Sequence, residues 1–115
     1  MDRILIFKIL DNKPALLLKL DFENQSKSWI LQDYVKVDKF RKRMAFEVEI
    51  ETLSNDKELN LFEEGKLRVE FCKKKKIKFT AEGLKSFRGE YIFYIPSWGF
   101  NTEKKIWVLI PSHIM

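Results

Sequence analysis

Alternation of apolar and polar residues, the pattern typical of β-strands, recurs along most of this chain. The clearest examples are residues 44–51, 67–72 and 76–81. A strand places successive side chains on opposite faces of a sheet, so every second residue faces the core. The chain is therefore predicted to consist mainly of strands, each with one buried face.

The alternation also predicts which residues are buried. In 44–51, three glutamates would face water and the residues between them would face the core, namely Met44, Phe46, Val48 and Ile50. In 67–72 the same pattern directs three residues inward: Leu67, Val69 and Phe71. In 76–81 it places Ile77 and Phe79 inward, and Lys76, Lys78 and Thr80 outward.

Four other segments are apolar at nearly every position. They cover residues 4–10, 15–22, 91–95 and 106–110. Strands of this kind are usually central in a sheet or covered by another element. Asp11, Asn12 and Pro14 supply turn chemistry between the first two segments, so residues 3–22 are predicted to form a hairpin.

Two short helices are also compatible with the sequence. Asp38 could cap a helix over 39–44, and Asn55 or Asp56 could cap one over 57–64. Gly65 would end the second helix in a left-handed conformation, and residues 63–66 carry a turn pattern.

We therefore predict one domain over 1–115, with seven or eight strands in a mainly β fold. The expected architecture is an antiparallel barrel or sandwich with at most one or two short helices, and an α+β sheet is the alternative. A chain of 115 residues can bury a core without disulfides or a metal.

The composition bears on the cellular compartment of the protein. It has a single cysteine, Cys72, and no apolar run long enough to span a membrane. Its first residues lack the apolar core of a secretory signal. We expect a cytoplasmic protein with no membrane partner.

Few residues are suited to catalysis or metal binding. The one histidine, His113, lies at the C-terminal end, and Cys72 has no second cysteine to resolve an oxidised form. One histidine and one cysteine do not make a zinc site, and phosphate-loop and nucleophile-elbow motifs are absent. We predict no enzyme activity, no catalytic residues, no metal and no cofactor.

Charge points instead to an anionic partner. The formal net charge is +5, and the charges occur in blocks, with a net −5 over 47–70 and a net +5 over 71–90. Lysines in the second block could neutralise phosphates, while aromatic residues nearby could stack on unpaired bases. The predicted nucleic-acid-binding residues are Lys73, Lys74, Lys75, Lys76, Lys78, Arg88, Tyr94, Trp98 and Phe100.

A protein-interaction or structural module is the alternative. The oppositely charged blocks could complement each other between two chains. The apolar surplus of 91–95 and 106–110 could form a homodimer interface. Independently of that alternative, the lysines could serve solubility alone, and Trp98 and Phe100 could close the end of a barrel. The favoured prediction is single-stranded or unpaired nucleic acid as the partner.

Overall fold

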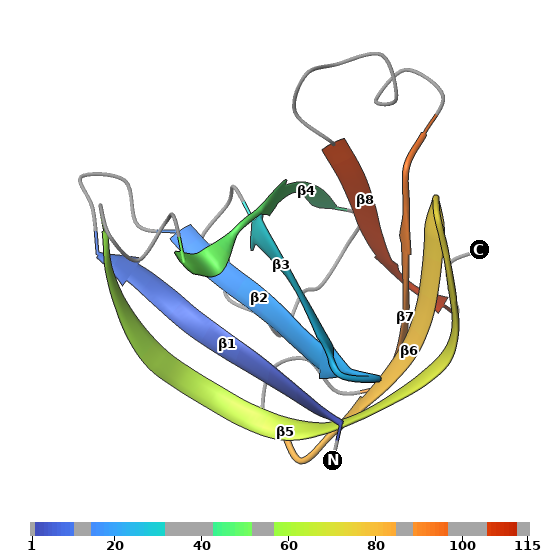
Figure 1. Ribbon diagram of the computed structural model, residues 1–115, viewed down its shortest axis with the longest axis horizontal. Helices are drawn as coiled ribbons and strands as arrows, with labels where there is room; N and C mark the ends of the chain where they lie inside the picture. The colour runs from blue at the N-terminus through green and yellow to red at the C-terminus, as the bar shows by residue number, and fades with distance from the viewer. Residues whose placement is uncertain are drawn as a thin grey trace.

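Eight antiparallel strands form a closed barrel (Figure 1). The computed structural model describes residues 2–10, 15–31, 43–51, 57–84, 89–96 and 106–112. The strands are β1 (Arg3–Leu10), β2 (Ala15–Phe22), β3 (Gln25–Leu31), β4 (Arg43–Val48), β5 (Glu58–Lys73), β6 (Lys76–Glu82), β7 (Gly89–Tyr94) and β8 (Ile106–Pro111). The predicted mainly β fold is confirmed as an antiparallel barrel. The alternative prediction of an α+β sheet is wrong.

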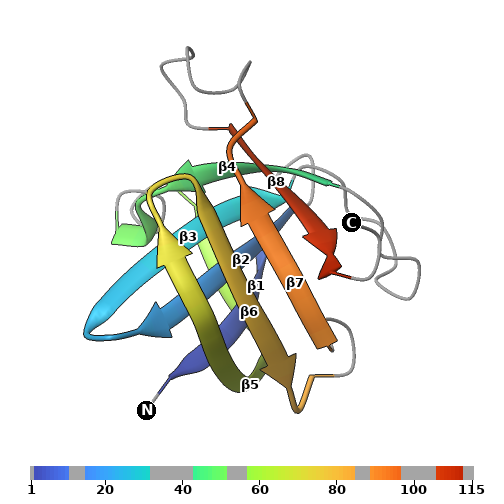
Figure 2. The same ribbon diagram turned by 90° about the vertical axis from the view of Figure 1, so that its right-hand side faces the viewer.

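Two four-stranded meanders make up the barrel. The order around it is β1-β2-β3-β4-β8-β7-β6-β5, and β5 closes it against β1. Figure 2 shows β5, β6, β7 and β8 side by side in the second meander. The predicted hairpin over 3–22 is confirmed, because β1 and β2 pair from Arg3–Asp21 to Ile9–Ala15.

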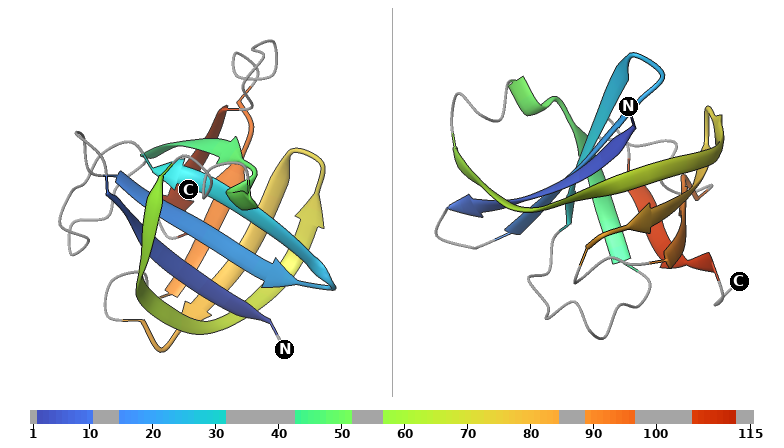
Figure 3. Two further views of the ribbon diagram at one scale, coloured as in Figure 1. Left: turned by 60° about the vertical axis from the view of Figure 1, so that its left-hand side comes forward. Right: turned by 90° about the horizontal axis from the view of Figure 1, so that it is seen from below.

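The long strand β5 pairs with two neighbours, β1 of the first meander and β6 of the second. Its first half pairs with β1 as far as Lys66, and its second half pairs with β6. The strand curves strongly around the barrel (Figure 3). Register shifts occur in both halves, between Leu61 and Glu63 opposite β1 and between Val69 and Phe71 opposite β6. Such bulges bend a strand and increase its twist, which suits it to this curved path.

Side chains fill the barrel interior. Its largest fully buried members are Trp29, Trp107, Phe79 and Phe93, accompanied by leucines and isoleucines of β1 and β2. The rings of Trp29 and Phe93 are stacked with their centroids 4.2 Å apart, and Trp107 meets Trp29 edge-on at 5.7 Å. An eight-stranded barrel is just wide enough for such a packed interior.

The outer surface of the barrel is also apolar in places. Ile92 and Val108 alternate with interior residues of β7 and β8, yet both are buried, and they form a second cluster with Ile110. Leu5 and Leu17 are buried as well, although they lie outside the interior cluster. This explains why these strands are apolar at consecutive positions.

The predicted buried face of β4 is wrong. Ala45 is fully buried in the interior, whereas Met44 is 42% exposed and Phe46 and Val48 are half-buried. The register sets this orientation, because Ala45 lies opposite Leu31 of β3 and Trp107 of β8. The strand also ends at Val48, two residues before the predicted Ile50.

The predicted helix over 57–64 and the turn over 63–66 are also wrong, because β5 continues through both. The other predicted helix, over 39–44, lies outside the described residues except at its end, where Arg43 and Met44 belong to β4. Within the described parts of the chain, the structure contains no helix long and apolar enough to cross a bilayer.

Gly65 lies in β5 where its pairing passes from β1 to β6, and the end of β6 comes close to it there. A Cβ atom added there would overlap the backbone oxygen of Glu82 and lie 2.9 Å from the Leu84 side chain. We therefore expect Gly65→Ala to lower the free energy of unfolding by about 1–3 kcal/mol, the usual cost of overpacking. Urea denaturation measures it, with Asn60→Ala, an exposed change on the same strand, expected to cost under ~0.5 kcal/mol. Equal stabilities of the two variants would contradict this packing.

Candidate nucleic-acid interface

Four consecutive lysines form the connection between β5 and β6. Lys73 ends β5 and lies opposite Lys76, which begins β6, while Lys74 and Lys75 form the turn between them. The side chains of Lys73, Lys74 and Lys75 are exposed, and that of Lys76 is half-buried. We call residues 73–76 the lysine turn. It concentrates positive charge at one end of the barrel wall.

The lysine turn is anchored to β7. The backbone N–H of Ile95 donates a hydrogen bond of 2.9 Å to the backbone oxygen of Lys75, and Lys76 pairs in register with Tyr94. Directly opposite residues of an antiparallel pair share a face, so Lys76 and Tyr94 lie side by side on the barrel's outer surface. Tyr94 is partly exposed and packs against the cluster of Ile92, Val108 and Ile110.

Lys78 forms an ion pair with an acidic residue of β5. Its Nζ lies 3.3 Å from Oε2 of Glu70, and both side chains are roughly one-third exposed. The predicted outward direction of Lys78 is confirmed. Its neighbours Ile77 and Phe79 are buried in the interior, and the Lys78 side chain between them is only half-buried. A phosphate that contacts this ammonium group would have to compete with the carboxylate of Glu70.

Phe71 joins this surface and was predicted to be in the core. The bulge at Glu70 shifts the alternation, so Leu67 is buried and Val69 packs on the core, whereas Phe71 lies opposite Lys78. The Nζ atom of Lys73 is 5.3 Å from the centre of the Phe71 ring. The position of Lys73 is a sequence signal for the outward direction of Phe71. Residues 71 and 73 share a face in an unbroken strand, and the charged Lys73 cannot face the core.

The structure brings together Lys73, Lys74, Lys75, Lys76, Lys78 and Tyr94 of the predicted binding residues. Arg88, Trp98 and Phe100 lie outside the described residues, so their place in the interface stays a prediction. Cys72 carries an exposed free thiol beside the turn.

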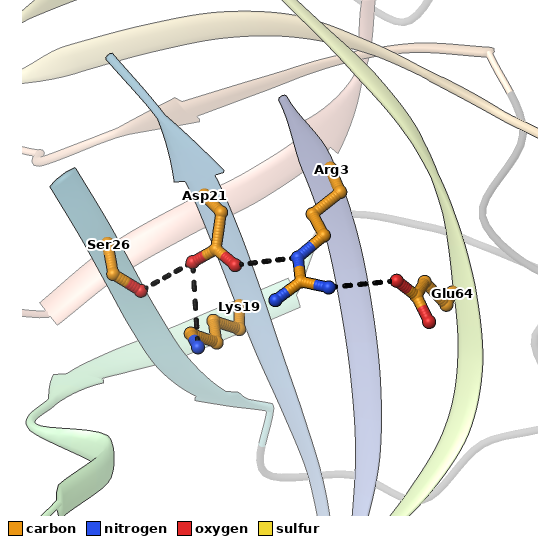
Figure 4. A network of polar contacts seen from close by, with 5 residues as sticks. All are labelled: Arg3, Lys19, Asp21, Ser26 and Glu64. Carbon is orange, nitrogen blue, oxygen red and sulfur yellow. Dashed lines mark hydrogen bonds and ion pairs between the residues drawn. The ribbon is translucent and has the colours of Figure 1, made fainter. Parts of the chain in front are cut away.

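A second polar cluster lies on the outer surface near the start of β1 (Figure 4). Arg3 bridges two strands, with Nε 3.1 Å from Oδ2 of Asp21 and Nη1 3.2 Å from Oε1 of Glu64. The hydroxyl of Ser26 donates to Asp21 at 2.7 Å, and Lys19 lies 3.6 Å from the same carboxylate. These contacts join β1, β2, β3 and β5.

The contacts of this cluster shift the pKa values of Asp21 and Arg3. Partial burial favours the neutral form of Asp21, but the hydrogen bonds from Ser26 and Arg3 and the charge of Lys19 outweigh it and lower the pKa of the carboxyl group. The hydrogen bond to Asp21 raises the pKa of Arg3. The cluster borders an open groove of about 880 Å³ whose charged residues include both signs. Its charges satisfy one another, so we assign it a structural role.

The described residues outside these two clusters offer few groups that could form a functional site. Among them, no three histidine, cysteine or acidic side chains are grouped so that they could hold a metal ion. Glu47, one of the three glutamates of the 44–51 pattern, is paired with Lys27 at 3.9 Å. The lysine turn with its aromatic neighbours is therefore the candidate site. No protein-family model matches this chain, and no curated protein sequence is similar to it.

Proposed function

We propose that this protein binds single-stranded nucleic acid on the outer surface of β5, β6 and β7, without catalysis. Phosphates would contact the lysine turn, and unpaired bases would stack on aromatic rings beside it. A positively charged groove or surface with adjacent aromatic rings is the combination that single-strand-binding proteins use.

The observation that carries the proposal is the position of the lysine turn beside Tyr94. Lys76 begins β6 and Tyr94 ends β7, so they are distant in the sequence, and the barrel places them directly opposite each other. A nucleic-acid strand lying across β6 could therefore contact cations and an aromatic ring within a few ångströms.

A competing explanation is protection of a strand edge. Beyond Leu67, whose N–H donates to the backbone oxygen of Asp2, β5 pairs with β6 alone among the described residues, so its second side is a strand edge with respect to them. Lysines and bulges on such edges prevent association with other strands. This explanation predicts no more affinity for nucleic acid than the net charge of the whole protein confers.

Paired substitutions separate the two explanations. Each lysine that contacts a phosphate of a single strand contributes about 0.7 to the slope of log affinity against log salt. Lys74→Ala with Lys75→Ala should therefore lower the slope by about 1.4. A control with Lys8→Ala and Lys66→Ala has the same net charge but changes β1 and the middle of β5.

Fluorescence anisotropy with a labelled oligonucleotide provides the measurement. We expect the control protein to keep the wild-type slope. If both double variants lose the same amount, binding follows net charge alone and the assignment to the lysine turn is wrong.

Protein interaction is the second candidate, and exposed apolar residues favour it. Leu10, Leu61 and Phe62 are 43–52% exposed and come from the paired strands β1 and β5. A homodimer through the C-terminal strands stays a prediction, although Ile92, Val108 and Ile110 are already buried within one chain. Loss of the nucleic-acid proposal would bring protein interaction to first place.

A further inference from the structure

A bulge in β5 moves one aromatic ring from the core to the surface. Val69 lies opposite Phe79 and Phe71 lies opposite Lys78, so Glu70 is the extra residue between them. If the alternation ran through Glu70 without a bulge, Phe71 would follow Leu67 and Val69 into the barrel. Bulges are common next to functional sites, where they redirect a side chain.

The redirected ring lies among cations. Lys73 places its Nζ 5.3 Å from the ring centre, and Lys78, directly opposite, is held by Glu70 at 3.3 Å. The ring is half-buried. Its contact with Lys73 is a weak one for an exposed cation and ring, so a base could replace the lysine over the ring while the lysine moves to a phosphate.

We infer that Phe71 stacks on an unpaired base and makes the site prefer single strands to duplexes. This inference rests on the proposed function. Lysines neutralise the phosphates of single strands and duplexes alike, so they cannot supply that preference. A ring can supply it, because the bases of a duplex are already stacked and must be unstacked before a side chain reaches their faces.

The protein contains a matched control for this ring. Phe62 lies at the other bulge of β5, is 43% exposed, and has the Nζ of Lys8 4.3 Å from its ring centre. It therefore resembles Phe71 in strand, in a bulge at or beside it, and in cationic neighbour. It differs in position, because it lies in the first half of β5 beside Glu63 and Glu64, far along the strand from the lysine turn.

The test compares three ligands. Wild type, Phe71→Ala and Phe62→Ala are titrated by anisotropy into a labelled single strand, its duplex, and an oligonucleotide of abasic sites that has phosphates but no bases. Phe71→Ala should weaken single-strand binding by about 5- to 140-fold, the range measured for loss of a base–aromatic stack. Binding to the duplex and the abasic strand, and the salt slope, should stay as in wild type. Phe62→Ala should match wild type throughout.

The three ligands distinguish failure of the stacking role from failure of the proposed function. If Phe71→Ala binds the single strand as wild type does, or weakens all three ligands equally, the stacking role is wrong while the proposed function stands. If wild type binds none of the ligands at low salt, the proposed function fails and the stacking role fails with it. Circular dichroism checks the fold of each variant, and Phe71→Leu, which keeps an apolar side chain but no ring, should show the same selective loss if the alanine variant does not fold.

Discussion

Replacing Trp29 with alanine is expected to lower the free energy of unfolding by about 3–5 kcal/mol, the usual cost of deleting a buried aromatic side chain. Trp29 has no exposed surface. Its ring extends from β3 across the interior to Phe93 of β7, with the centroids 4.2 Å apart, and makes a T-shaped contact with the ring of Trp107 of β8. Alanine would remove contacts between the two meanders and leave a cavity that neighbouring strands cannot fill.

Trp29→Phe provides the comparison. Phenylalanine keeps a ring against Phe93 and removes the indole N–H, which is buried and has no hydrogen-bond partner among the described residues. We therefore expect a clearly smaller loss than for alanine. Urea denaturation followed by far-ultraviolet circular dichroism measures both variants. A loss under about 1 kcal/mol for Trp29→Ala would contradict the packed interior.

Alternation predicted the strands well where one face meets the core and the other meets water. In β6, Ile77 and Phe79 are buried, and Lys76 and Lys78 lie outside, as expected. The same rule chose the wrong face of β4. Both faces of that strand adjoin apolar residues, since Ala45 lies between Leu31 and Trp107 while Phe46 lies between Ile30 and Ile106. When both faces of a strand adjoin apolar residues, the local sequence pattern does not determine which face lies in the barrel interior. The register with the neighbouring strands determines it.

The first half of β5 was the hardest element to predict. Its sequence contains acidic residues and a glycine, which favour a capped helix followed by a turn. Tertiary structure overrides these preferences, because Gly65 is required where β5 closely approaches the backbone of Glu82. The bulges opposite Ile6 and Phe79 each insert one residue, and a change of phase that small has no strong local signature.

The candidate site was only partly accessible from sequence. The lysines are consecutive, so their grouping is a property of the chain itself. The neighbouring ring of Tyr94 depends on the pairing of β6 with β7, and alternation along one strand says nothing about its partner. Alternation over 67–72 predicts Phe71 in the core, and the bulge at Glu70 reverses that prediction.

The lysine turn should account for a large share of the salt dependence of binding. Replacing Lys73, Lys74, Lys75 and Lys76 by glutamine removes up to four phosphate contacts, which should lower the slope of log affinity against log salt by about 2.8. Between 50 and 200 mM salt, those four contacts alone correspond to roughly a 50-fold loss of wild-type affinity that the variant would not show. The exposed positions in the turn should tolerate glutamine with little change in stability.

Anisotropy titrations of one labelled single-stranded oligonucleotide, with wild type and this four-lysine variant across that salt range, test the central claim most directly. We predict measurable binding by wild type at low salt, a steep loss of affinity as salt rises, and a slope about 2.8 smaller for the variant. Absence of wild-type binding at low salt, or the same slope for both proteins, would contradict nucleic-acid binding at the lysine turn.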